Sequence, residues 1–196
     1  RSRWIRWATR IMTRALAARL GMVGRSWMMR RLIVLLSSLA LLHLLHDCFA
    51  GGEVTLFAAT VDHGLRPEAA AEAEVAGAAA ARLGISHAVL RWEDGPQEGN
   101  LQNQAREARY DLLTGWARRH GIPVLALGHT ADDQAETVLM RMARASGVTG
   151  LSGMAERRTH NGVTLLRPLL DVPARRVRRL RGDHRRGALH ERLRQS

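Results

Sequence analysis

Short apolar runs, each followed by a longer segment of helical character, recur through the middle of this 196-residue chain. The runs have the length and aliphatic content of buried strands, and they occupy residues 32–36, 54–61, 87–92, 124–128 and 163–170. The last run is interrupted by Arg167-Pro168. Strands that alternate with helices predict an α/β fold, in which a parallel, Rossmann-like sheet is covered by helices on both faces.

The segments between these runs carry residues that typically begin and end helices. Pro67 suits the first turn of one helix, Gly84 suits its end, and Asn100 can cap the next helix. Helices are therefore predicted from residue 39 after a turn at Ser37-Ser38, over residues 68–83 and 100–120, and from residue 130 to about residue 145. Loops are predicted at residues 93–99 and 146–153, where glycine, proline and polar residues gather.

The stretch of residues 124–137 combines a buried strand with a dense group of ionisable side chains. Gly128 lies at the end of the strand, and Thr130 occupies the N-cap position of the following helix. The ionisable residues are His129, Asp132, Asp133 and Glu136. Because open α/β sheets bind ligands at the carboxyl ends of their strands, this group is a candidate site. The alternative is that the two aspartates only favour the helix dipole and that Glu136 is solvated.

Polar residues also follow two other predicted strands. Ser37 and Ser38 come after the first strand, and Asp62 and His63 come directly after the second. In a doubly wound sheet the carboxyl ends of parallel strands meet at one rim, so these residues are expected to lie near His129 although they are distant in sequence.

The helix predicted over residues 100–120 carries Arg106 and Arg109 three positions apart, with Tyr110 next to them. An arginine pair at this spacing shares one face of a helix and can grip a phosphate or a carboxylate. The alternative is that both arginines are solvated and that Tyr110 belongs to the core. The spacing alone does not decide between the two.

The net charge of +12 suggests a nucleic-acid partner, but the charge is unevenly distributed. All 30 basic residues are arginine. Residues 1–46 hold nine arginines and no acidic residue, and residues 171–196 hold nine arginines and three acidic residues. The remaining centre holds 12 arginines and 15 acidic residues, so the basic excess belongs to the two ends and says nothing about the partner of the central domain.

The single cysteine, Cys48, excludes a disulfide within the chain and fits a cytoplasmic protein. Residues 32–45 are apolar and follow Met28-Met29-Arg30-Arg31, which is also the pattern of a secretory signal. The run is shorter than the roughly 20 apolar residues that span a membrane, and the second apolar run at residues 54–61 favours a strand and a helix instead. We therefore expect no membrane segment.

Five pieces of this sequence, in order and at their spacing, resemble the tRNA(Ile)-lysidine synthetases of the PP-loop ATP pyrophosphatases. They are VDHGLRPEA from Val61, AREARYDLL from Ala105, GHTADDQAET from Gly128, RMARASGVTGLSGM from Arg141 and RPLLDV from Arg167. With the run from Ser38, the resemblance covers about residues 38–172 and implies an adenine nucleotide alpha hydrolase-like fold. Related tRNA thiolases generally use several cysteines, whereas this chain has only Cys48.

The resemblance implies an ATP-dependent ligation. ATP, with Mg²⁺, would adenylate the C2 oxygen of the wobble cytidine of tRNA(Ile), and the amine of L-lysine would then displace AMP to give lysidine. By the same resemblance Asp133 and Glu136 would bind lysine, and His129, Asp132 and Arg106 would be catalytic. The ATP-binding residues would be Ser37, Ser38, Asp62, His63 and Arg109, with no residue assigned to a metal.

The chain departs from the family at its phosphate loop and at both ends. The family pattern Ser-Gly-Gly-x-Asp-Ser would fall on residues 33–38, where only the final Ser38 matches. Both glycines that let backbone N–H groups approach pyrophosphate are missing, so we expect impaired ATP binding. We divide the chain into a basic extension at 1–31 outside the fold, a catalytic domain at 32–172 and an arginine-rich tail at 173–196.

Two other functions compete with a lysidine synthetase domain of impaired activity. The first is a non-catalytic RNA-binding remnant that uses the arginine-rich ends, which predicts a steep salt dependence of tRNA binding. The second is a secreted precursor. Residues 1–31 fit three interpretations: a transit peptide, a basic arm for RNA, or sequence foreign to the fold. We favour foreign sequence, because the charge distribution and the family motifs change at nearly the same positions of the chain.

Overall fold

The computed structural model describes residues 31–35, 39–50, 54–64, 68–93, 95, 99–143 and 152–179. Its elements, in chain order, are β1 (Arg31–Leu35), α2 (Leu39–Cys48), β2 (Thr55–Asp62), α3 (Glu68–Arg82), β3 (Ser86–Arg91), α4 (Leu101–Arg119), β4 (Val124–Ala126), α5 (Ala131–Ala143), β5 (Arg157–His160) and β6 (Val163–Leu166). Residues 174–179 are also helical. The alternation of strands and helices expected from the sequence is confirmed.

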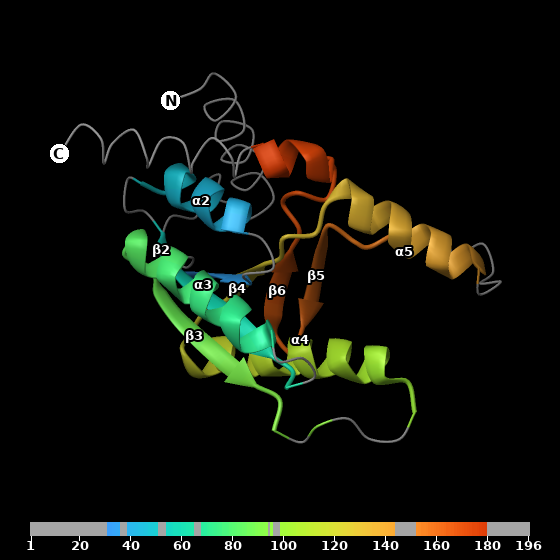
Figure 1. Cartoon of the computed structure of the whole chain (residues 1–196), viewed down its shortest axis with the longest axis horizontal. Helices are drawn as coiled ribbons and strands as arrows, with labels where there is room; N and C mark the ends of the chain where they lie inside the picture. Colours follow the sequence, from blue (N-terminus) through green and yellow to red (C-terminus); the bar gives the residue numbers. More distant parts are fainter. Residues whose placement is uncertain are drawn as a thin grey trace.

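The strands form one six-stranded sheet in the order β3-β2-β1-β4-β6-β5 (Figure 1). The pairs β1–β2, β1–β4, β2–β3 and β4–β6 are parallel, and β5 runs antiparallel to β6 at the edge. Chain order reverses at the contact between β1 and β4, which is the topological switch point of a doubly wound sheet. This topology places the ends of β1 and β4 side by side.

Two hydrophobic clusters cover the two faces of the sheet. One joins α2 to Ala58, Ala80 and Leu166, and includes Val177 of the helical segment at residues 174–179. The other joins Tyr110, Leu113 and Ala117 of α4 to Leu125 and Leu165. Neighbouring residues of β2, β4 and β6 go to opposite clusters, as the alternation of side chains along a strand requires.

Helix α5 differs from the other helices because none of its residues is buried. Figure 1 shows it leading away from the sheet, with its first turn next to the end of β6 and the helical segment at residues 174–179. Leu139, Met140 and Met142 in its second half are exposed. The first turn of α5, where the candidate site residues lie, is held by hydrogen bonds to Val172 and Ala174.

The sequence interpretation was wrong at β6. The strand ends at Leu166, and Leu169 and Leu170 lie in a turn although both side chains are buried. Pro168 has no N–H to donate to a sheet, which accounts for the end of the strand. The edge strand β5, which runs antiparallel to β6, was not predicted either, although the Rossmann-like parallel sheet itself is confirmed.

The hairpin that joins β5 to β6 turns at Asn161 and Gly162, whose φ angles are 47° and 77°. Two consecutive residues with positive φ are the requirement of a type I′ turn, and Asn-Gly is the sequence that most favours it. The dipeptide was therefore a usable indication of the hairpin.

Several expectations fall outside the described residues. They concern Ser37 and Ser38, residues 1–30 of the basic extension, residues 144–151 of the glycine-rich loop and residues 180–196 of the tail. Within the described ranges no helix combines the length and the hydrophobicity that crossing a membrane requires.

Candidate functional site

A cavity of about 1060 Å³ opens at the carboxyl edge of the sheet, beside the switch point between β1 and β4. Its volume lies at the upper end of the range of ligand pockets. Its described lining comes from α2, α3, α4, the segment that joins β4 to α5, the first turns of α5, and the helical segment at residues 174–179. The site residues predicted in this lining are Arg106, Arg109, His129, Asp132, Asp133 and Glu136.

The first turn of α5 is built around Thr130 and Asp133. The backbone N–H and the hydroxyl of Thr130 both donate to Oδ2 of Asp133, at 2.7 and 2.6 Å. Burial alone would raise the pKa of Asp133. The two hydrogen bonds from Thr130, together with the nearby His129, lower it by more than burial raises it, so the pKa lies below its ordinary value. Asp133 thus caps its own helix as an ionised carboxylate.

Asp132 and Glu136 differ in their partners. Oδ1 of Asp132 accepts the backbone N–H of Ala174 at 2.9 Å, so this carboxylate ties α5 to the start of the helical segment at residues 174–179. Glu136 is exposed and makes no hydrogen bond or ion pair with the described residues. Of the carboxylates on α5 that line the cavity, Glu136 is therefore the one whose oxygens are both open to a ligand.

His129 follows β4 and contacts a buried arginine. Nε of Arg167 donates to Nδ1 of His129 at 3.2 Å. Burial lowers the pKa of His129 to about 4, helped by the charges of Arg167, Arg106 and Arg109 and opposed by Asp133. His129 is therefore neutral at pH 7.

Arg109 joins the cavity to the end of β2. Its Nε and NH2 atoms lie 3.3 and 3.1 Å from Nε2 of His63. Burial lowers the pKa of His63, Arg109 lowers it further, and Asp62 opposes both. Nδ1 of His63 is buried without a hydrogen-bond partner among the described residues. His63 is thereby held as a neutral ring against α4.

Arg106 and Tyr110 are neighbours on α4. The guanidinium of Arg106 lies 5.7 Å from the centre of the Tyr110 ring, and that of Arg158 lies 5.4 Å from it. Tyr110 is 5% exposed, so its assignment to the core is confirmed, while the two arginines flank its ring. Arg106 is exposed and also lines the cavity.

Asp62 and His63 lie beside the cavity rather than in its described lining. Oδ1 of Asp62 accepts the N–H of Gly64 at 2.9 Å, which closes the turn after β2. His63 reaches the cavity only through Arg109. The predicted residues thus converge on one edge of the sheet, and their individual roles stay predictions.

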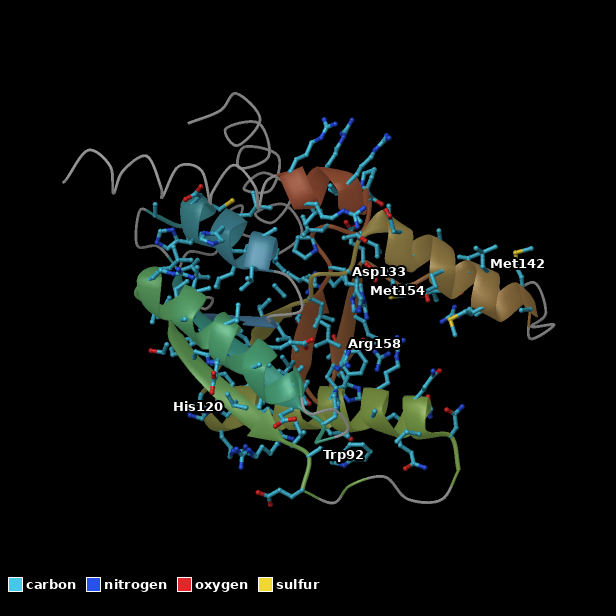
Figure 2. All side chains as sticks on the ribbon, viewed as in Figure 1. Trp92, His120, Asp133, Met142, Met154 and Arg158 are labelled. Atoms are coloured by element: carbon cyan, nitrogen blue, oxygen red, sulfur yellow. The ribbon has the colours of Figure 1, made fainter. Side chains whose placement is uncertain are left out.

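Several residues that line the cavity, or lie behind its lining as Arg167 does next to His129, were not predicted as site residues. Arg167 is 2% exposed, and Glu72 of α3 and Arg178 of the helical segment line the cavity. Figure 2 shows Asp133 beside that segment, Arg158 between β5 and α4, and Met142 near the far end of α5. Arg167 could have been noticed as a charge inside an apolar run, but Glu72 and Arg178 carry no comparable indication.

The described residues contain no group of three or more histidine, cysteine, aspartate or glutamate side chains placed to hold a metal ion. The carboxylates of Asp132 and Asp133 already accept N–H groups. No step is therefore assigned to a resident metal.

A family model described as the PP-loop domain matches residues 23–185. The chain belongs to the PP-loop domain family. The match extends beyond residues 38–172, which carried the resemblance in the sequence, and it includes all the cavity residues described above.

Curated relatives of this PP-loop domain bear the name tRNA(Ile)-lysidine synthase. That of Ruegeria pomeroyi is 58% identical over 135 residues, which cover 69% of this chain and 32% of the relative. That of Methylobacterium nodulans is 51% identical, covering 63% of this chain and 37% of the relative. That of Wolbachia pipientis wMel is 41% identical, covering 76% of this chain and 35% of the relative. The chain thus spans about a third of the length of these relatives.

Solved structures of lower identity confirm the fold. The tRNA thiolase NcsA of Methanococcus maripaludis, solved with its 4Fe–4S cluster, gives a TM-score of 0.72 at 21% identity and covers 90% of this chain and 63% of its own. An ammonia-dependent NAD synthetase of Campylobacter jejuni gives a TM-score of 0.57 at 13% identity, with 92% of this chain and 72% of its own covered. Both agree with the expected adenine nucleotide alpha hydrolase-like fold.

Proposed function

We propose that this PP-loop domain carries the catalytic site of a cytoplasmic tRNA(Ile)-lysidine synthase. The observation that carries the proposal is the 58% identity to a protein of that name over 135 residues, which are 69% of this chain. In the proposed reaction the C2 oxygen of the wobble cytidine attacks the α-phosphorus of ATP and pyrophosphate leaves. The amine of L-lysine then attacks C2, and AMP leaves with the oxygen.

The cationic side of the cavity suits the nucleotide. Arg106 and Arg109 lie on one face of α4, and neutral His129 faces the same space. Arginine donates to phosphoryl oxygens in a fixed fork and stays charged, so the pair is suited to the α-phosphoryl group and the departing pyrophosphate. ATP enters this scheme as its Mg²⁺ complex, in which the ion offsets charge on the phosphates.

The carboxylates of α5 suit lysine. Glu136 has both oxygens open, and Asp133 keeps its Oδ1 open while Oδ2 caps the helix. Two carboxylates one turn apart share a helix face and can bind an ammonium group between them through charge attraction at short range. Asp132 is assigned a supporting part, since its Oδ1 holds the helical segment at residues 174–179 against the cavity.

The proposal includes impaired ATP binding. Ile33, Val34 and Leu35 belong to β1, so only residues 36–38 separate this strand from α2, and the Gly-Gly pair of the family is missing there. Titration calorimetry with ATP–Mg²⁺ tests this point. Dissociation constants well above the micromolar range support impairment, and micromolar binding contradicts it.

The activity itself is tested with radiolabelled L-lysine, ATP–Mg²⁺ and tRNA(Ile) with a cytidine at the wobble position. The expected result is ATP-dependent incorporation of lysine into that tRNA and none into the same tRNA with a uridine there. AMP and pyrophosphate should each form in an amount equal to the lysine incorporated. Incorporation into both tRNAs, or into neither at high ATP concentration, would contradict the proposal.

A second candidate function is RNA binding without catalysis, which the helical segment at residues 174–179 favours. Its arginines Arg175, Arg176, Arg178 and Arg179 are all exposed, while Val177 is buried. Replacing Arg175 and Arg179 with glutamine should reduce both tRNA affinity and its salt dependence, by about one unit of slope for each phosphate that is no longer neutralised. An unchanged slope would contradict this second function.

A further inference from the structure

Arg167 is a buried cation whose partners are neutral. Its side chain is 2% exposed. Its Nε donates to Nδ1 of His129 at 3.2 Å, its NH1 to the carbonyl oxygen of Ala155 at 2.5 Å, and its NH2 to the hydroxyl of Tyr110 at 3.3 Å. No described carboxylate pairs with it. A guanidinium buried in this way is costly to the fold, so its place beside the cavity calls for a reason in the site.

The hydrogen bond to His129 determines where the imidazole carries its proton. The Nε–H of arginine can only donate, because the guanidinium has no acceptor and does not lose its proton in proteins. Nδ1 of His129 must therefore offer its lone pair. This excludes both the Nδ1–H tautomer and the doubly protonated ring, and it leaves the neutral ring with its proton on Nε2.

The remaining ring nitrogen faces the cavity. His129 lines the cavity and makes no further hydrogen bond with the described residues, and its Nε2 is not among their buried, unpartnered atoms. The charged groups around the ring are Arg167 after β6, Arg106 and Arg109 on α4, and Asp133 on α5. Three of these four disfavour a second proton.

We propose that Arg167 is a positioning residue that holds His129 as the neutral Nε2–H tautomer, so that His129 acts as a hydrogen-bond donor in the cavity and not as a general base. Placed in the proposed function, the donor would face an anionic phosphoryl oxygen of the nucleotide. The tautomer can be tested separately from this role toward the nucleotide, since the tautomer is a property of the free protein.

Long-range ¹H–¹⁵N NMR of the histidine rings in the full chain tests the tautomer directly, with His129→Gln used for assignment. The expected spectrum shows a protonated Nε2 and an unprotonated Nδ1 from pH 8 down to about pH 5, since the pKa of His129 is lowered to about 4. A protonated Nδ1 in the wild-type chain overturns the proposal. This measurement needs no activity.

Two substitutions identify Arg167 as the cause. Arg167→Met removes the donor and the charge, and it should give mixed tautomers and a pKa of His129 closer to 6.5. Tyr110→Phe is the matched control, because it removes another hydrogen bond of Arg167 and leaves the bond to His129 in place. An unchanged tautomer in Arg167→Met, or the same change in Tyr110→Phe, contradicts the assignment to the hydrogen bond between Arg167 and His129.

The donor role has a kinetic consequence that does rest on the proposed function. His129→Ala should reduce the rate of tRNA adenylation about 100-fold, the effect of removing one donor to developing negative charge. His129→Gln supplies an N–H donor but is no base, and it should keep most of the rate. Equal losses in the two variants would contradict the donor role, whereas a wild-type chain without adenylation would refute the proposed function and leave the NMR result intact.

Discussion

Oδ2 of Asp133 accepts hydrogen bonds from both the backbone N–H and the hydroxyl of Thr130, at 2.7 and 2.6 Å. One carboxylate oxygen thus bonds back to the N-cap residue of α5, while Asp133 also lines the cavity. The arrangement resembles a capping box, in which the residue at the third helical position bonds back to the N-cap. A residue proposed to bind substrate is also part of the fold, so mutations at Asp133 alone cannot separate the two roles.

Thr130→Val separates them. It removes the hydroxyl donor, keeps the volume and the N–H, and leaves the Asp133 carboxylate in place. We expect the free energy of unfolding in urea to fall by about 1 kcal/mol, the usual effect of losing a helix cap. Thr137→Val is the control on the same helix, because its hydroxyl donates only to the backbone oxygen of Asp133, and it should change stability by less than about 0.5 kcal/mol.

The pH dependence of this difference has a definite sign. The pKa of Asp133 lies below 3.8 in the folded chain, so its ionised form stabilises the fold at pH values above 3.8. That stabilisation is lost as the pH falls through the folded pKa. The difference in stability between the wild type and Thr130→Val should therefore be constant near neutral pH and shrink below about pH 3.8. A difference that grows on acidification would contradict the assigned bond.

Glu136 gives the cleaner test of lysine binding, because it has no partner among the described residues to lose. Glu136→Gln should leave the free energy of unfolding within about 0.5 kcal/mol of the wild type. It should raise the KM for L-lysine at least about tenfold, since an ion pair in the cavity loses its charge. Steady-state kinetics at saturating ATP–Mg²⁺ measure this.

Glu107→Gln is the control for Glu136, because Glu107 is exposed on α4 and bonds to Asn103 outside the cavity. It should leave the KM for lysine unchanged. If Glu136→Gln lowers stability and leaves the KM for lysine as it was, the assignment of Glu136 to the substrate is wrong.

The features that the sequence could predict are local ones. The strand at β4, the N-cap at Thr130 and the carboxylates behind it depend on neighbours within a few residues, so periodicity and capping rules found them. Asn100 was found as a cap for the same reason, and its side chain accepts the N–H of Asn103 at 3.2 Å. The switch-point rule for doubly wound sheets predicted that His63 lies near the His129 group, and His63 does contact Arg109 of the cavity, although that contact itself was not predicted.

The features that the sequence could not predict depend on contacts between residues far apart in the chain. Asp132 bonds to Ala174, 42 residues away, and Arg167 bonds to Tyr110, 57 residues away. The apolar run around Arg167 could have indicated its burial, but no local pattern names the distant groups that it contacts. The orientation of β5 also depends on its register with β6, although the Asn161-Gly162 turn indicated the hairpin.

The contact between Arg109 and His63 predicts a coupled change in titration and binding. Arg109→Met should raise the pKa of His63, because the positive charge that disfavours the protonated ring is removed. It should weaken ATP–Mg²⁺ binding about tenfold, the loss of one charge-assisted hydrogen bond or more. Histidine NMR titration and calorimetry measure the two effects.

Arg118→Met is the matched control on α4, since Arg118 is exposed in the last turn and does not line the cavity. Both the pKa of His63 and the nucleotide affinity should stay at their wild-type values in this variant. A lower pKa of His63 in Arg109→Met would contradict the direction of the coupling.

Gly153 and Gln134 should show a large coupling energy, because the side-chain amide of Gln134 in α5 makes two hydrogen bonds to the loop before β5. The Gln134 side chain donates to the carbonyl oxygen of Met154 at 3.1 Å and accepts its N–H at 2.6 Å. A Cβ at Gly153 would lie 2.5 Å from Nε2 of that side chain.

Gly153→Ala must therefore displace the amide and break both bonds, which should cost about 2 kcal/mol of unfolding free energy at roughly 1 kcal/mol each. In a Gln134→Ala background the clash is absent, so Gly153→Ala should cost less than about 0.5 kcal/mol there. A double-mutant cycle measured by urea unfolding tests this coupling. Additive effects of the two substitutions would contradict the contact. Gly115→Ala, inside α4 and near only Arg119, should instead raise stability by about 0.5–1 kcal/mol.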